Sequence, residues 1–135
     1  MSKANTTEND ILKMMLQGTD PAWRAGATIY LALYTADPGE AGTAITNEAT
    51  YTNYARVAIT KASGWTDGGS SFGNAGLLQF PQCGASGNTI THFGLVSTAS
   101  GAGQLFVSGA LNDSLAVANL IQPQFAIGAI TIVED

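Results

Sequence analysis

Short apolar segments with a period of two residues, separated by turn-forming residues, constrain the fold of this chain most strongly. The two alternating sets of side chains in Ala27–Ala36 are both mostly apolar, namely Ile29, Leu31 and Leu33 in one set and Tyr30, Ala32 and Tyr34 in the other. Neighbouring side chains of a strand point to opposite faces, so the segment is predicted to be a central strand covered on both faces. Asp37-Pro38-Gly39 is expected to end it in a turn, because proline presets φ and glycine accepts a positive φ.

The rest of the chain repeats this arrangement of short strands and turns. Further strands are expected at Tyr54–Lys61, Ala75–Phe80, Thr89–Ser97, Gln104–Leu111 and Gln124–Val133, with a short edge strand at Asp113–Ala118. Loops are expected at Thr43–Asn53, in the glycine-rich stretch Asp67–Gly76 and, as a hairpin loop, at Thr98–Gly103. Gly128 is interpreted as a bulge within the last strand. This pattern predicts an all-β, jelly-roll-like β-sandwich, although periodicity alone does not separate a jelly roll from an immunoglobulin-like strand order.

The N-terminal region departs from the period of two. A helix is predicted over Thr7–Gln17, with Thr7 as N-cap, Asp10 at the third helical position and Gly18 as the residue that stops it. The apolar stripe of this helix consists of Ile11, Leu12, Met15 and Leu16. We therefore expect a single domain over residues 1–135, with an arm and short N-terminal α-helix in 1–20 and the sandwich in 21–135.

The charge content of the chain is low. Charged residues make up 11% of the sequence, whereas soluble domains usually carry about 25%. This composition favours a surface that neighbouring subunits cover, the alternative being a secreted or virion-type domain with a neutral polar surface. The net charge is −5 and the five basic residues do not cluster, so neither nucleic acid nor a membrane is expected as a partner.

The sequence offers few groups for catalysis or metal binding. His92 is its only histidine and Cys83 its only cysteine, whereas a zinc site needs three or four protein ligands. We expect His92 in the core or on a sheet surface, and Cys83 either as a free thiol or as a small buried residue. No metal, cofactor or catalytic residue is predicted. The lack of an internal disulfide and of an apolar signal segment predicts a protein made in the cytoplasm.

One catalytic motif is matched formally. Gly69–Gly73 (GSSFG) fits G-x-S-x-G, a motif that works where a parallel strand turns sharply into a helix. Here it falls in a predicted loop between β-type segments, so a chance match is the preferred interpretation. An esterase would need Ser71, His92 and an acid such as Asp113 to converge, and we expect a protein that is not an enzyme.

Large side chains on the helix and near predicted loops are candidates for partner contacts, because such residues dominate protein interfaces. The candidate interface residues are Ile11, Met14, Met15, Trp23, Tyr51, Tyr54 and Trp65. An alternative for the aromatic residues is that they close the ends of the sandwich. An alternative for the methionines is that they belong to the core rather than to a helix that docks into a neighbour's groove.

Residues 31–60 (LALYTADPGEAGTAITNEATYTNYARVAIT) resemble a family of small virion proteins of tailed phages. Members pair an L-Y/F-T-A-D-P-G-E-A-G segment with a Y-A-R-V strand further along the chain. The later segments THFGLVSTASGAGQLFVSGAL and FAIGAITI are also similar, so the resemblance covers most of the chain from Gly26 to Val133. Members are often labelled tail fibre proteins, and the chain most resembles the capsid cement (decoration) protein of a short-tailed Bordetella phage.

This resemblance implies a structural virion protein without catalytic residues. The cement likeness implies a jelly roll that binds the outer surface of an HK97-like capsid, with the major capsid protein as its partner. Copies on an icosahedral shell are expected to form a homo-oligomer, with a dimer favoured. The alternative that the sequence leaves open is a small tail or tail-fibre accessory module with a receptor- or glycan-binding role.

Overall fold

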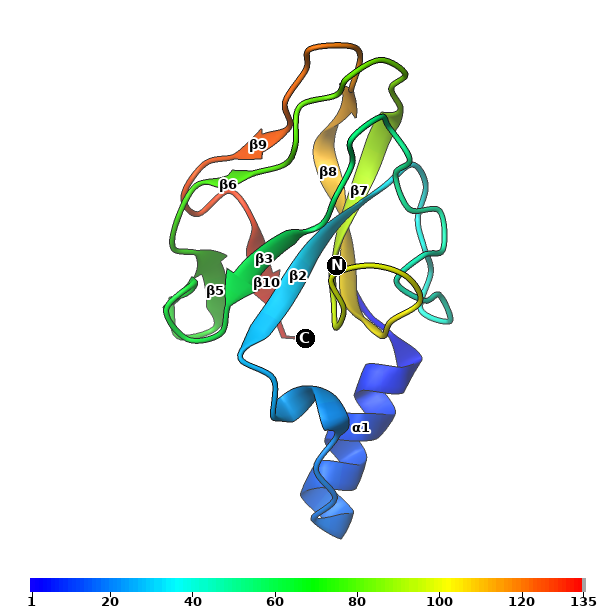
Figure 1. The fold of residues 1–135 in the computed structure, drawn as a ribbon. Helices are drawn as coiled ribbons and strands as arrows, with labels where there is room; N and C mark the ends of the chain where they lie inside the picture. The colour runs from blue at the N-terminus through cyan, green and yellow to red at the C-terminus, as the bar shows by residue number, and fades with distance from the viewer. Residues whose placement is uncertain (135) are drawn as a thin grey trace.

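A computed structural model describes residues 1–134 of the chain as a β-sandwich with one projecting helix (Figure 1). The helical elements are α1 (Asn5–Gln17) and the short 3₁₀ helix η1 (Ala22–Arg24). The strands are β1 (Ser2–Lys3), β2 (Thr28–Tyr34), β3 (Val57–Thr60), β4 (Trp65–Asp67), β5 (Ser71–Asn74), β6 (Leu78–Gln79), β7 (Thr89–Val96), β8 (Leu105–Ala116), β9 (Gln124–Phe125) and β10 (Thr131–Val133). The predicted all-β sandwich with a short N-terminal helix is confirmed.

The main sheet has five antiparallel strands in the order β1-β8-β7-β2-β3. Strand β2 lies between β7 and β3, and its last four residues are fully buried. Leu31 and Leu33 belong to the larger of two hydrophobic clusters, whereas Ala32 and Tyr34 belong to the smaller one on the opposite face. The prediction of a central strand covered on both faces is therefore confirmed.

The larger cluster fills the space between the main sheet and two small sheets. These are a three-stranded sheet in the order β10-β5-β4 and a two-stranded sheet of β6 and β9. Ile130, next to β10, and Leu78 of β6 contribute buried side chains to this cluster, as does Phe80. Cys83 is buried in it as well and donates a weak hydrogen bond to the Ser86 carbonyl. This face of the main sheet holds most of the core.

The smaller cluster lies under the segment that follows β2. Tyr34 donates a hydrogen bond from its hydroxyl to the carbonyl of Ala44, and both residues are completely buried. The predicted turn at Asp37-Pro38-Gly39 is present, with Gly39 at φ +71° and its N–H donating to the Asp37 carboxylate. This turn directs the segment across the outer face of the main sheet.

The prediction of a loop at Asp67–Gly76 is wrong in part, because this glycine-rich stretch contains most of a β-hairpin. Strands β4 and β5 pair through Trp65↔Asn74, and Gly69 occupies the positive φ of +91° that their turn requires. Glycine content weakens a local strand prediction, but pairing of β5 with β10 supplies hydrogen bonds that the local sequence does not show. Conversely, the strands predicted at Tyr54–Lys61 and Ala75–Phe80 shorten to β3 and β6.

Two further strand predictions are corrected. The prediction of a separate edge strand at Asp113–Ala118 is wrong. Residues 113–116 instead continue β8 beyond an irregularity in its pairing with β7. The single strand predicted over Gln124–Val133 splits into β9 and β10, with Gly128 in a turn at φ +75° rather than in a bulge. The buried side chain of Asn74 holds this turn, since it accepts the Ile130 N–H and donates to the Ala126 carbonyl. These distant contacts decide where the strand ends.

The helix differs from its prediction at its first turn only. It begins at Asn5 and follows strand β1, which pairs with β8, so Thr7 is not the N-cap. Ala4 takes the N-cap position, where its methyl side chain cannot cap the helix, and its backbone N–H bonds to the carbonyl of Phe106. Gly18 ends the helix at φ +64°, as predicted.

Candidate interaction surface

Helix α1 projects from one end of the sandwich rather than packing along it (Figure 1). Leu12, Met15 and Leu16 are exposed by 50%, 66% and 78%. Met15 and Leu16 lie three and four positions after Leu12, so the three side chains lie on one side of the helix. Ile11 and Met14 are half-buried. A group of exposed large apolar side chains is typical of a surface that a partner covers, so this helix face is the candidate interaction surface.

The first turn of the helix is fixed to the sandwich by buried polar contacts. Thr7 is 7% exposed and donates its hydroxyl hydrogen to the Leu105 carbonyl at 3.1 Å. The same hydroxyl oxygen accepts a hydrogen bond from the Gln104 side-chain amide. Because the anchor lies at the start of the helix, the last turns carry their apolar residues away from the body of the protein.

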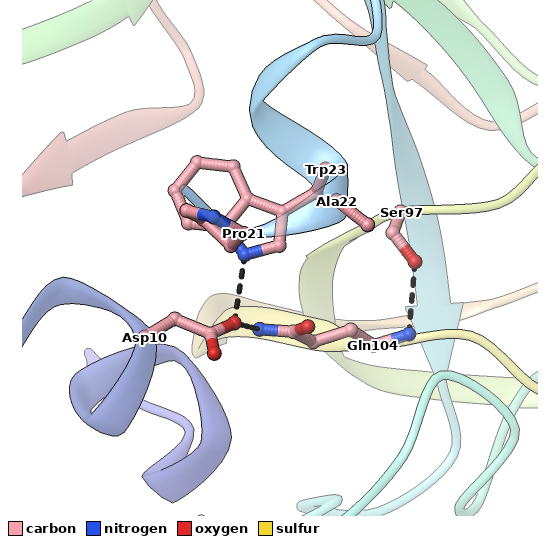
Figure 2. Close-up of a pocket in the computed structure, with 6 residues that line it drawn as sticks. All are labelled: Asp10, Pro21, Ala22, Trp23, Ser97 and Gln104. Carbon is pink, nitrogen blue, oxygen red and sulfur yellow. Dashed lines mark hydrogen bonds between the residues drawn. The ribbon is translucent and has the colours of Figure 1, made fainter. Parts of the chain in front are cut away.

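A second anchor lies one turn further along, in an open cleft of about 480 Å³ (Figure 2). The carboxylate of Asp10 accepts hydrogen bonds from the indole N–H of Trp23 at 2.9 Å and from the amide of Gln104 at 3.0 Å. These two bonds favour the ionised form and lower the pKa of Asp10 below its ordinary value of 3.8. Asp10 therefore holds α1 to η1 and to the hairpin loop between β7 and β8.

Trp23 is the residue through which η1 joins the helix to the sandwich. Its ring packs edge-to-face on Phe106 of β8, with the ring centroids 5.3 Å apart. The indole N–H of Trp23 also donates to Asp10. The Lys61 ammonium lies over the Trp23 ring, 5.9 Å from its centroid. Trp23 is thus occupied by contacts within this chain, and its predicted partner contact stays a prediction.

The other aromatic candidates lie in or against the core. Tyr51 is 2% exposed and donates its hydroxyl hydrogen to the Pro81 carbonyl, and burial raises its pKa to about 12. Tyr54 stacks on Phe80 with the ring centroids 6.2 Å apart, and Trp65 packs against the same cluster. Tyr51, Tyr54 and Trp65 therefore pack into or against the core, as expected for the alternative in which aromatic residues close the sandwich. The structure brings together Ile11, Met14 and Met15 on α1, but not Tyr51, Tyr54 or Trp65 with them.

Sequence reasoning missed a polar cluster centred on Arg56, whose side chain is 1% exposed. The guanidinium binds both carboxylate oxygens of Glu48 at 2.6 and 2.9 Å and donates to the carbonyls of Thr98 and Gly101. Tyr54 donates to the same carboxylate. The signal that could have revealed it is the single arginine in the otherwise apolar Y-A-R-V segment, since a buried arginine requires a paired carboxylate. This cluster ties the β2–β3 connection to the β7–β8 loop at one end of the sandwich.

The residues of the esterase hypothesis are placed on separate elements. Ser71 begins β5 in the three-stranded sheet, whereas His92 and Asp113 lie on β7 and β8 of the main sheet. The His92 Nδ1 atom shares a hydrogen bond with the hydroxyl of its neighbour Thr91. The G-x-S-x-G match thus sits on a hairpin strand, whereas a nucleophile elbow needs a turn from strand into helix. This placement gives Ser71 no strained, exposed position.

Within residues 1–134, no three histidine, cysteine, aspartate or glutamate side chains gather in a way that would hold a metal ion. Neither helical element of the described chain has the length and apolar character that crossing a bilayer requires.

The chain matches a known protein-family model over residues 2–133. The matching model describes the podophage GP4 fiber I protein gp80. A comparison with curated proteins finds no match. The family match covers the projecting helix, both small sheets and the whole main sheet, so it applies to the complete architecture described above. The chain therefore belongs to the family of the podophage GP4 fiber I protein gp80, a family of phage structural proteins of the fibre type.

Proposed function

We propose that this protein is a structural subunit of a phage fibre that attaches to a neighbouring virion protein through helix α1. The observation that carries this proposal is the exposed apolar face of that helix, made of Leu12, Met15 and Leu16. Full burial of an exposed apolar side chain is worth about 1.5–3 kcal/mol, so covering these three partly exposed side chains favours attachment. The family match to a fibre protein supports the location on a fibre.

The way in which the helix is held also supports attachment through it. Its base is fixed by Thr7 and Asp10, while the exposed residues lie in the later turns. A rigidly held helix loses less conformational entropy on binding than a disordered tail would, which favours a permanent attachment. The same face would serve either a neighbouring fibre protein or a second copy of this chain, and a homo-oligomer remains part of the proposal.

The test replaces Leu12, Met15 and Leu16 with glutamine in the phage genome and counts copies of the protein per purified particle. We expect a folded variant protein and a loss of at least tenfold in the number of incorporated copies. Leu77→Gln is the matched control, because Leu77 is 53% exposed but lies outside α1. Normal incorporation of the triple variant would show that attachment does not use this helix.

A second candidate is a capsid decoration protein that binds the major capsid protein on the outer shell. The low charge content of 11% and the net charge of −5 support it, because a surface poor in charge suits a tightly covered position outside the DNA. Separation of purified virions into heads and tails distinguishes the two locations. Copies found on isolated heads at a fixed number per shell support decoration, whereas copies found only with tail fibres support the first proposal.

A further inference from the structure

Strand β8 contains an irregular section that interrupts its pairing with β7, close to strand β9 of the two-stranded sheet. His92 pairs with Ala110 and Ile90 pairs with Leu115, so the four residues 111–114 of β8 stand opposite Thr91 alone. Extra residues in one strand bend it away from its partner, and such bulges often occur beside functional sites. Here the bulge moves Asn112 and Asp113 out of the regular ladder, and both are exposed.

The bulge forms one wall of a cleft of about 310 Å³, and β9 forms another. The apolar lining includes Leu111, Leu115 and Phe125, all half-buried. The ring of Phe125 is supported from behind by an edge-to-face contact with Phe80, at 6.1 Å between ring centroids. A cleft of this volume suits one or two small ring-shaped units, and a fixed aromatic ring offers them a flat apolar surface.

The polar lining consists of Asn112, Asp113 and Gln124. All three residues are exposed, so their polar side-chain atoms are accessible to a ligand in the cleft. Two amides and a carboxylate together offer both donors and several acceptors to a ligand rich in hydroxyl groups. None of the five basic residues of the chain lines the cleft, so its chemistry opposes an anionic ligand.

We propose that this cleft binds a neutral saccharide, with Phe125 against the apolar face of a sugar ring and the three polar side chains on its hydroxyl groups. The proposal rests on the proposed function, since a fibre subunit is a component that can meet the host surface. An added peptide strand fits the site less well, because the bulge interrupts the regular edge that such a strand would pair with.

The experiment is a titration of the purified full chain with glucose, galactose, rhamnose and N-acetylglucosamine, followed through the backbone amide signals in NMR spectra. We expect at least one of these neutral sugars to cause saturable shifts confined to residues 110–115 and 124–130. Sialic acid, an anionic sugar, is the comparison and should bind at least tenfold more weakly. The double variant D113A/Q124A should lose at least about tenfold in affinity, the sum of two lost hydrogen bonds.

Asn119→Ala is the matched control, because Asn119 is an exposed polar residue outside the cleft. Asp113→Asn is a second variant that keeps the size of the side chain. If its amide spectrum without sugar matches that of the original protein, any loss of binding does not come from unfolding. Absence of saturable shifts with all four neutral sugars, or equal binding by the folded double variant, would overturn the proposal. If the protein is nevertheless found on the fibres of virions, the proposed function stands without this site, whereas its absence from virions removes the proposed function itself.

Discussion

At the scale of single residues, Arg56 organises one end of the molecule. Its guanidinium reaches Glu48 in one loop and Thr98 and Gly101 in another, and the Arg56 side chain itself is only 1% exposed. The hydrogen bond with Glu48 raises the pKa of Arg56 above its ordinary value, so this arginine stays charged at every pH where the protein is folded. A buried charge of this kind is tolerated only while its partner remains in place.

We predict that Glu48→Ala destabilises the protein by about 3–5 kcal/mol, because it leaves the buried Arg56 charge without its partner. Denaturant unfolding followed by circular dichroism measures the change. The surface ion pair of Arg24 and Asp20 is the matched control, since both side chains are 59% exposed. Asp20→Ala should cost about 1 kcal/mol or less. Equal costs for the two substitutions would contradict the structural role assigned to Arg56.

At the scale of elements, helix α1 owes its position to polar anchors rather than to an apolar face against the sheet. Asp10 is the anchor that joins three elements, since it binds Trp23 of η1 and Gln104 of the hairpin loop. Of the apolar stripe that the sequence pattern predicts, Ile11 is half-buried, whereas Leu12, Met15 and Leu16 are exposed, Leu16 by 78%. An amphipathic pattern thus predicts that a face will be covered, but not which molecule covers it.

The lowered pKa of Asp10 predicts how this anchor responds to acid. The unfolded chain takes up a proton at a higher pH than the native one, so the contribution of Asp10 is complete above its ordinary pKa of 3.8 and is lost as pH falls below it. In a Trp65→Phe background, the fluorescence of Trp23 should change as Asp10 is protonated. The change should disappear in Asp10→Asn, and its persistence there would show that another group is responsible.

At the scale of the whole molecule, two clusters on opposite faces of the main sheet hold the sandwich together. Burial raises the pKa of Tyr51 to about 12 and also raises the pKa values of Tyr34 and Tyr54. Each of these phenols lies against a cluster or within it. The native state therefore keeps protons that the unfolded state releases near the ordinary tyrosine pKa of 10.0.

We predict that the protein loses stability as pH rises above about 10. The native state then holds more protons than the unfolded state, and each retained proton costs about 1.4 kcal/mol per pH unit. Tyrosinate absorbance and circular dichroism, recorded over the same alkaline titration, measure the effect. Ionisation of the buried tyrosines should coincide with loss of the native spectrum, and full ionisation while the fold persists would contradict the prediction.

Local sequence patterns determined the parts of the fold in which each segment carries its own signal. The alternation of Leu31 and Leu33 with Ala32 and Tyr34 assigned the two faces of β2 correctly, because side-chain direction in a strand follows from parity alone. The turn at Gly39 and the helix end at Gly18 were predictable for a similar reason, since both positions need a positive φ. The family resemblance likewise followed from motifs within single segments.

Only the tertiary structure decided which segments and side chains meet. The β4–β5 hairpin depends on pairing with β10, and the break between β9 and β10 depends on the buried amide of Asn74. The core position of Tyr51 and the exposure of Met15 likewise follow from packing between distant elements. The physical reason is the same in each case: hydrogen bonds and burial across long sequence separations outweigh local propensity, and periodicity does not record their partners.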